Sequence, residues 1–160
     1  MMKRILFLVI VVIPFLLISC ETGNNGPEYE EYIPFDANTA IAIVKNIYIQ
    51  WSDATANKDI TTMYKLSKPG SNFEGMSNVC VEQWKTNPMY HFKFTNVSVM
   101  YINKDEATVD GIADFIQGPP NGGINGTHIN YREKFRSGAV FVDGKWLLDG
   151  FNEYEFITSW

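Results

Sequence analysis

The spacing of hydrophobic residues along the chain changes from a helical to a strand-like period. Between residues 36 and 57, apolar side chains recur three or four positions apart, at Ala40, Ile43, Val44, Ile47, Trp51 and Ala54. Residues at this spacing share one face of a helix. The pattern therefore predicts an amphipathic helix over 37–57, with Asp36 as its N-cap.

Two shorter helices are expected after this one. Asp59 can cap a helix that carries several apolar residues between 60 and 66, and Pro69–Gly70 would end it. Ser77 predicts the start of a third helix with Val81 and Trp84 on one face, ending at Asn87–Pro88.

Beyond the third helix the period becomes two, which is typical of strands. Apolar and polar residues alternate over 92–95 and again over 97–102, but the phase slips by one position at Thr95–Asn96. Such a slip predicts a β-bulge. A turn at 103–105 and a second strand over 107–115 follow.

The third predicted strand begins near His128, after a loop at 117–126. One face of it is apolar except for Glu133, and the other face carries His128, Asn130, Arg132, Lys134 and Arg136. Pairing with the second strand would place this basic face beside Asp110 and Asp114. We therefore expect solvated ion pairs there in preference to an anion site.

The C-terminal part contains one strong turn signal. Asp143–Gly144 predicts a hairpin between strands at 139–142 and 146–148. The tail 153–160 is expected to be a last strand or cap that packs on the domain. If its apolar side chains were exposed instead, they would indicate a partner site.

The N-terminus has the pattern of a secretory signal. Lys3 and Arg4 precede the apolar run 5–18, which is shorter than the 20 or so residues that a spanning helix needs. The end of this run and the two residues after it, Leu17-Ile18-Ser19-Cys20, resemble the lipobox of bacterial lipoproteins. That resemblance implies removal of residues 1–19 and a diacylglycerol, with palmitate-type chains, on Cys20. The domain would then be lipid-anchored to the cell membrane or outer membrane, outside the cytoplasm.

The length and charge of the remaining chain narrow the class of protein. Without residues 1–19, 141 of the 160 residues remain, which is enough for one domain with a hydrophobic core. Residues 20–35 are polar and glycine-rich, so they predict a flexible tether before a single domain at 36–160. Loss of Lys3 and Arg4 changes the formal net charge from −5 to −7, which argues against nucleic-acid binding. Cys80 has no partner if Cys20 is lipidated, and its apolar neighbours predict a buried structural thiol.

Helices followed by a curved sheet predict an α+β fold. The run from Asn103 to Val109 and the ending from Val142 to Phe151 (VDGKWLLDGF) resemble nuclear transport factor 2-like domains, a superfamily that includes ketosteroid isomerase-like enzymes and polyketide cyclases. The resemblance covers roughly 36–151. It implies a cone in which N-terminal helices pack on a curved mixed or antiparallel sheet and enclose a pocket, and homodimers that form through the outer sheet face.

Residues for such a pocket can be proposed from the pattern. The pocket candidates are Tyr48, Trp51, Tyr64, Trp84, Phe94, Tyr131 and Glu133. Among the acids and bases, Asp110 and His128 face outward and His91 lies at a strand start. Glu133 is therefore the one candidate for a catalytic acid or base, although a structural role as an acceptor is favoured about two to one. No metal cluster or cofactor is expected.

Three functions stay open. The first is a non-catalytic module at the membrane that binds a small hydrophobic ligand or an envelope protein. The second is an isomerase- or cyclase-like enzyme using Glu133, and the third is a structural subunit of an envelope complex. An open cavity at Glu133 without a buried donor would favour catalysis, whereas a capped carboxylate in a closed core would exclude it.

Overall fold

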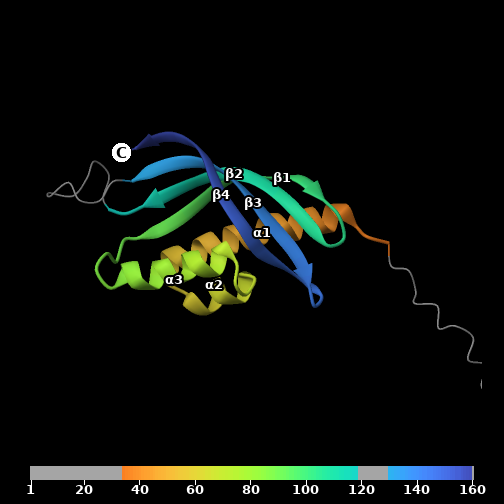
Figure 1. Ribbon diagram of the computed structural model, residues 1–160, viewed down its shortest axis with the longest axis horizontal. Coiled ribbons are helices and arrows are strands. Elements are labelled where there is room, and N and C mark those ends of the chain that lie inside the picture. The colour runs from red at the N-terminus through yellow and green to blue at the C-terminus, as the bar shows by residue number, and fades with distance from the viewer. Residues whose placement is uncertain (1–33, 119–129, 160) are drawn as a thin grey trace, which may run out of the picture. The chain divides into compact units, whose positions relative to one another are not determined.

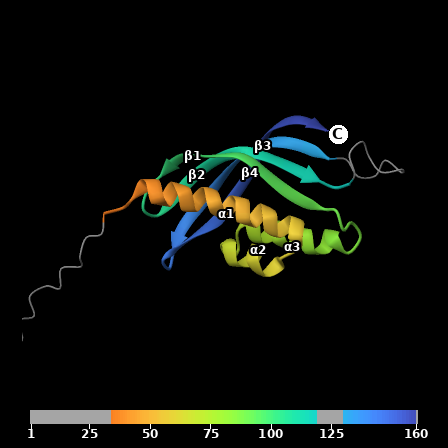
Figure 2. The same ribbon diagram turned by 180° about the vertical axis from the view of Figure 1, so that it is seen from behind.

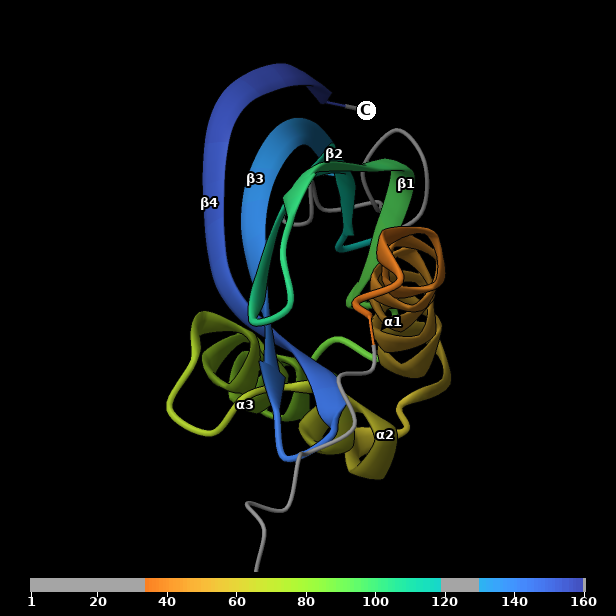
Figure 3. The same cartoon turned by 90° about the vertical axis from the view of Figure 1, so that its right-hand side faces the viewer.

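The computed structural model describes residues 34–118 and 130–159. Three helices are followed by four strands: α1 (Ala37–Asn57), α2 (Ile60–Leu66), α3 (Asn72–Trp84), β1 (His91–Ile102), β2 (Glu106–Ile116), β3 (Tyr131–Val142) and β4 (Lys145–Ser159). The strands form one antiparallel sheet in the order β1-β2-β3-β4 (Figure 1). The sheet curls strongly, and the helices pack on its concave side (Figures 2 and 3). The expected α+β architecture is confirmed.

Side-chain caps define the first two helices as predicted. The Asp36 carboxylate accepts hydrogen bonds from the backbone N–H groups of Asn38 and Thr39 at the start of α1. Asp59 accepts from the N–H of Thr62 at the start of α2. Each cap satisfies N–H groups that have no partner inside the helix. The apolar stripe of α1 faces the core, except that Ile43 is exposed.

The start of α3 differs from the prediction. Its N-cap is Ser71, whose hydroxyl accepts from the N–H of Glu74, and Ser77 lies inside the helix. The buried Ser77 hydroxyl donates to the carbonyl oxygen of Phe73, one turn earlier. Because this bond satisfies the hydroxyl within the helix, Ser77 is compatible with a mid-helix position. The buried residues of α3 are Phe73, Ser77 and Cys80, while Val81 and Trp84 of the predicted face are half-buried and Trp84 packs against the core.

Bulges account for the curl of the sheet. The register of β1 against β2 shifts between Thr95 and Ser98, as predicted, and Asn96 has a φ of 53°. Asparagine tolerates this left-handed backbone conformation better than most residues. Further shifts occur between β3 and β4. A bulge bends its strand and increases the twist, so these irregularities let a four-stranded sheet fold over the helices.

Two predicted turns are also present. Asp143 and Gly144 have φ values of 50° and 77° and join β3 to β4. Positive φ at both positions is typical of a two-residue hairpin turn. At the 103–105 turn, the Asn103 side-chain oxygen accepts from the N–H groups of Asp105 and Glu106.

The outer sheet face carries the ion pairs that the sequence indicated. Arg132 binds Asp114 with two hydrogen bonds of 2.6 and 2.8 Å, and Arg136 binds Asp110 with two of 2.8 Å. Lys134 Nζ lies 2.7 Å from a carboxylate oxygen of Glu155. We call these three pairs the outer ladder. They confirm the predicted ion pairing of the basic stripe at the positions that the structure describes, whereas His128 lies outside them.

The tail is the end of β4, which confirms a last strand. Its side chains are less well packed than expected: Tyr154 and Phe156 are 53% and 60% exposed. The expectation that the apolar side chains of this tail pack on the domain is therefore wrong for these residues, although the strand pairs with β3. In the part of the chain with assigned structure, no helix is long and apolar enough to cross a membrane.

Large aromatic residues fill the space between the helices and the sheet. The aromatic core comprises Tyr48, Trp51, Phe73, Phe94, Phe135 and Phe151, all buried. Trp51 meets Phe73 edge-on at a centroid distance of 5.0 Å, and Phe94 and Phe135 are also 5.0 Å apart. At Gly111, a Cβ atom would lie 2.6 Å from Cε1 of Phe135, so the absence of a side chain there admits the Phe135 ring.

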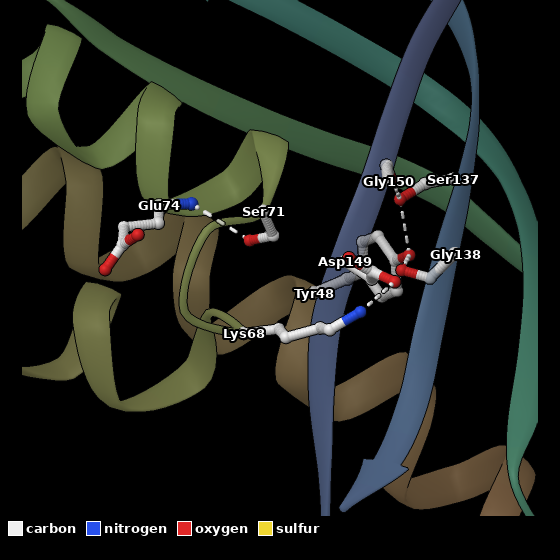
Figure 4. A network of polar contacts seen from close by, with 8 residues as sticks. All are labelled: Tyr48, Lys68, Ser71, Glu74, Ser137, Gly138, Asp149 and Gly150. Carbon is white, nitrogen blue, oxygen red and sulfur yellow. Dashed lines mark hydrogen bonds and ion pairs between the residues drawn. The ribbon is translucent and has the colours of Figure 1, made fainter.

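Tyr48 joins α1 to the two strands furthest along the chain (Figure 4). Its hydroxyl lies 2.6 Å from Ser137 Oγ and 3.1 Å from the carbonyl oxygen of Gly138. Ser137 Oγ in turn donates to the carbonyl oxygen of Gly150 on β4. Burial raises the pKa of the Tyr48 hydroxyl well above its usual value, so it stays a neutral donor.

Replacing Tyr48 by phenylalanine tests the importance of this hydroxyl. The change keeps the ring but removes the single O–H that Ser137 Oγ and the carbonyl oxygen of Gly138 share, so we expect a loss of about 1–2 kcal/mol in the free energy of unfolding. Urea unfolding followed by tryptophan fluorescence measures it.

Tyr64→Phe is the matched control. It removes a hydroxyl bonded to Asn78 on an exposed surface, and should cost less than about 0.5 kcal/mol. Equal losses in both variants would contradict the assignment of Tyr48.

Candidate functional site

A pocket of about 460 Å³ lies between α3 and the sheet. Helix α3 contributes Asn72, Gly75, Met76 and Val79, and the sheet side contributes Tyr90, Phe92, Phe115, Phe151 and Glu153. Val79 and Glu153 are exposed, so the pocket opens to solvent. Its walls are mainly apolar and aromatic, which is the usual character of small-molecule sites.

The aromatic wall follows from the strand register. Phe92 on β1 and Phe115 on β2 are direct cross-strand partners, and their ring centroids are 4.7 Å apart. Tyr131 on β3 stacks on Phe115 at 4.4 Å, and Tyr90 meets Phe92 edge-on at 5.6 Å. Aromatic pairs at these distances and angles are favourable beyond their buried area. The sheet therefore presents a preformed aromatic surface to the pocket.

The end of α3 is fixed against the same wall. Trp84 Nε1 donates a 2.6 Å hydrogen bond to the carbonyl oxygen of Tyr90. This bond ties the helix to the segment that leads into β1. It holds Tyr90 in place as a lining residue.

Two carboxyl groups meet at the sheet side of the pocket. Glu153 pairs with Phe135 across the β3–β4 ladder, while Glu133 pairs with Phe156, so a register shift lies between them. The shift leaves Glu133 and Glu153 on the same face and close enough to hydrogen-bond to each other. A hydrogen bond between two carboxyl groups requires a proton on one of them. We call these two residues the acid pair.

The environment of the acid pair favours retention of that proton. Burial and the neighbouring Glu133 raise the pKa of Glu153 to about 7. Oε2 of Glu133 is buried and has no hydrogen-bond donor among the residues with assigned structure. Burial also raises the pKa of Tyr90 to about 12 and that of Tyr131 further above its usual value, so both phenols are neutral near pH 7. At neutral pH Glu153 can thus gain or lose a proton.

The residues that the sequence predicted for the pocket lie in several different environments, and none of them is among its lining residues. Tyr48, Trp51 and Phe94 belong to the aromatic core, and Tyr64 is exposed on α2. Trp84 does not line the pocket but holds the lining residue Tyr90 through a hydrogen bond to its carbonyl oxygen. Tyr131 backs the pocket wall and Glu133 lies beside a lining residue, so these two are the predicted residues nearest the pocket.

The remaining candidates have other surroundings. Asp110 is engaged in the outer ladder, and Nδ1 of His91 lies 2.7 Å from the carbonyl oxygen of Met89. Cys80 is buried, and burial raises the pKa of its thiol to about 12, which confirms the prediction of a buried thiol. His128 and Cys20 lie outside the described residues. Within 34–118 and 130–159, no three His, Cys, Asp or Glu side chains gather as a metal site would require.

Sequence reasoning missed Glu153 and the α3 side of the pocket. Glu153 was treated as the start of a tail, although it follows Phe151 at strand spacing and so shares its face. That spacing was a usable signal. No sequence signal indicated that Glu153 lies close to Glu133, because their contact depends on a register shift that no local pattern encodes.

Comparisons with known proteins place the fold. No protein-family profile and no curated protein sequence matches this chain. Matching solved structures include a candidate aromatic ring hydroxylase from Novosphingobium aromaticivorans, with a TM-score of 0.62, 9% identity, and coverage of 78% of this chain and 94% of that one. A candidate scytalone dehydratase from the same species has a TM-score of 0.60, 11% identity, and coverage of 76% and 87%.

A third match is a Nostoc punctiforme protein of unknown function with a cystatin-like fold, with a TM-score of 0.56, 11% identity, and coverage of 76% and 93%. The domain therefore has the cone-shaped α+β fold of nuclear transport factor 2-like and cystatin-like proteins, as its sequence resemblance implied. At these identities the likeness concerns the fold alone, and activity has to be argued from the site.

The raised pKa of Glu153 couples folding to pH. The ordinary value is 4.5 and the folded value is about 7, so the unfolded chain loses this proton first as the pH rises. The free energy of unfolding should therefore fall between about pH 4.5 and 7. Glu153→Gln, which cannot ionise, should lose less stability than the native protein between pH 5 and pH 8 in urea unfolding.

Glu155→Gln is the control, because Glu155 lies on the same strand but is bonded to Lys134 on the outer face. This variant should keep the native loss between the two pH values. If Glu153→Gln also kept it, the acid pair would not hold the proton.

Proposed function

We propose that this protein is a lipid-anchored protein of the bacterial cell envelope whose nuclear transport factor 2-like domain binds a small, largely apolar ligand. The observation that carries the proposal is the pocket between α3 and the sheet. Its volume of about 460 Å³ suits a small molecule, and aromatic rings from three strands form its wall. The polar groups at its edge, Asn72 and Glu153, would orient the ligand.

The location rests on the N-terminal sequence. The apolar run 5–18 and the lipobox-like Leu17–Cys20 support lipid attachment at Cys20. Stable anchoring takes more than one acyl chain, which a diacylglycerol on Cys20 would supply. Residues 20–35 would then tether the domain near the bilayer surface.

Replacing Cys20 tests the anchor. In a bacterial host supplied with an alkyne fatty acid, the native protein should be labelled and enter the detergent phase of a Triton X-114 separation. Cys20→Ser should lose the label, because no thiol remains for the diacylglycerol.

Cys80→Ala is the control, since this thiol is buried in the domain. It should be labelled like the native protein. Label on Cys20→Ser, or none on the native protein, would refute lipid attachment at Cys20.

Partial filling of the pocket tests ligand binding. Gly75 lines the pocket, and a Cβ atom there would meet nothing within 4 Å. Gly75→Leu should therefore fold and occupy part of the volume. We expect it to bind the neutral fluorescent probe N-phenyl-1-naphthylamine about tenfold more weakly than the native domain, equivalent to about 1.4 kcal/mol.

Gly75→Ala is the graded control and should bind the probe almost as the native domain does, because a methyl group fills little of the pocket. Fluorescence titration measures both affinities. Absence of probe binding to the native domain, or equal binding by Gly75→Leu, would refute the pocket as a ligand site.

A second candidate function is acid–base catalysis on the bound molecule. The specific observation is the acid pair, whose raised pKa at Glu153 suits proton transfer near neutral pH. Oε2 of Glu133 has no donor in the described chain, although Glu133 lies beside the lining residue Glu153 and is not itself a lining residue. Two proteins of similar fold carry enzyme names, a ring hydroxylase and a scytalone dehydratase. Recovery of a chemically altered ligand would favour this candidate over simple binding.

A further inference from the structure

The pocket contains an unbalanced negative charge. Glu153 is the one ionisable acid among its lining residues, and Glu133 lies beside it. The lining set includes no lysine, arginine or histidine. The cations nearest to the acid pair along β3 belong to the outer ladder, where Arg132 holds Asp114 and Lys134 holds Glu155. The protein therefore supplies no cation of its own from the residues that line the pocket.

Titratable groups on the surrounding elements do not supply one either. Tyr131 on β3 and Tyr90 before β1 face the acid pair and are neutral near pH 7. Cys80 on α3, which lies close to Tyr90, is a neutral thiol. The α3, β1 and β2 residues that line the pocket are Asn72, Gly75, Met76, Val79, Phe92 and Phe115, none of which can ionise.

Two independent features indicate what would complete the site. The first is the carboxylate of Glu153, which is exposed and lines the pocket, so it can accept a hydrogen bond from a bound ligand. The rings of Tyr90, Phe92, Phe115 and Phe151 form the rest of the sheet-side wall. Aromatic faces attract organic cations as well as apolar groups. A metal ion would not suit such a wall, and no cluster of three metal-binding side chains occurs in the described residues.

We propose that the ligand of this pocket is an amphipathic amine, whose protonated nitrogen binds the carboxylate of Glu153, beside Glu133, while its apolar body lies on the aromatic wall. This inference rests on the proposed ligand-binding function and specifies the chemical class of the ligand. The ammonium group would donate to this carboxylate, and its charge would offset that of the acid pair. Binding would favour the ionised form of Glu153, so uptake of the amine would release a proton near neutral pH.

Matched ligands of the same shape test the proposal. The probes are 1-naphthylmethylamine, a cation at pH 8, and 1-naphthylmethanol, its neutral counterpart, titrated into the domain by isothermal calorimetry. We expect the amine to bind about tenfold more tightly at pH 8, as a charge-assisted hydrogen bond warrants. The preference should shrink at pH 5.5, where the acid pair carries its proton. Titrations at pH 7 in two buffers of different ionisation enthalpy should show proton release.

Variants locate the preference within the pocket. Glu153→Gln should bind both probes equally, whereas Glu155→Gln, whose carboxylate is bonded to Lys134 on the outer face, should keep the native preference. Glu133→Gln provides a second test in case either variant folds poorly, and should also reduce the preference. Circular dichroism checks the fold of each variant.

The outcomes separate this inference from the proposed function. Equal binding of the amine and the alcohol by the native domain would overturn the amine assignment and leave the apolar pocket intact. A preference that persists in both Glu153→Gln and Glu133→Gln would also overturn it. If neither probe binds, the proposed ligand-binding function fails as well.

Discussion

The fold depends on how polar backbone atoms are satisfied inside an aromatic core. The register of β3 against β4 shifts between Ser137 and Ala139, and a shift of this kind interrupts the regular ladder of backbone hydrogen bonds. At this point the Tyr48 hydroxyl lies within hydrogen-bond distance of the carbonyl oxygen of Gly138, and the Ser137 hydroxyl donates to the carbonyl oxygen of Gly150. A buried carbonyl without a donor is costly, so these two side chains allow the sheet to bend where it must cover the helices.

The same core determines where a ligand can bind. Because Tyr48, Trp51, Phe94 and Phe135 occupy the centre, the space that remains lies to one side, between α3 and the strands. The polar residues that line this pocket are Asn72 on α3 and Glu153 on β4, and Glu133 on β3 lies beside Glu153. The chemistry of the pocket is therefore set by Glu133 and Glu153, and the large aromatic residues of α1 act through packing.

Local signals in the sequence accounted for most of the elements. Asp36 and Asp59 marked helix starts because a capping side chain acts within three residues, and Asp143–Gly144 marked a turn because both residues tolerate positive φ. The start of α3 was misplaced because Ser71 and Ser77 carry the same capping signal, and only the packing of Phe73 and Cys80 distinguishes them. The acid pair could not be predicted from the sequence, because it forms through a register shift between β3 and β4, which no local sequence pattern indicates.

The outer ladder has a consequence for how the domain responds to ionic strength. Its three ion pairs are attractive, and dissolved salt weakens the two more exposed pairs, Lys134–Glu155 and Arg136–Asp110, through screening over a Debye length of about 8 Å at physiological concentration. The acid pair on the opposite face is repulsive when both groups are ionised, and the same screening relieves it. The two effects have opposite signs, so when both acids are ionised, added salt should lower the stability of the domain by less than its effect on the outer ladder alone.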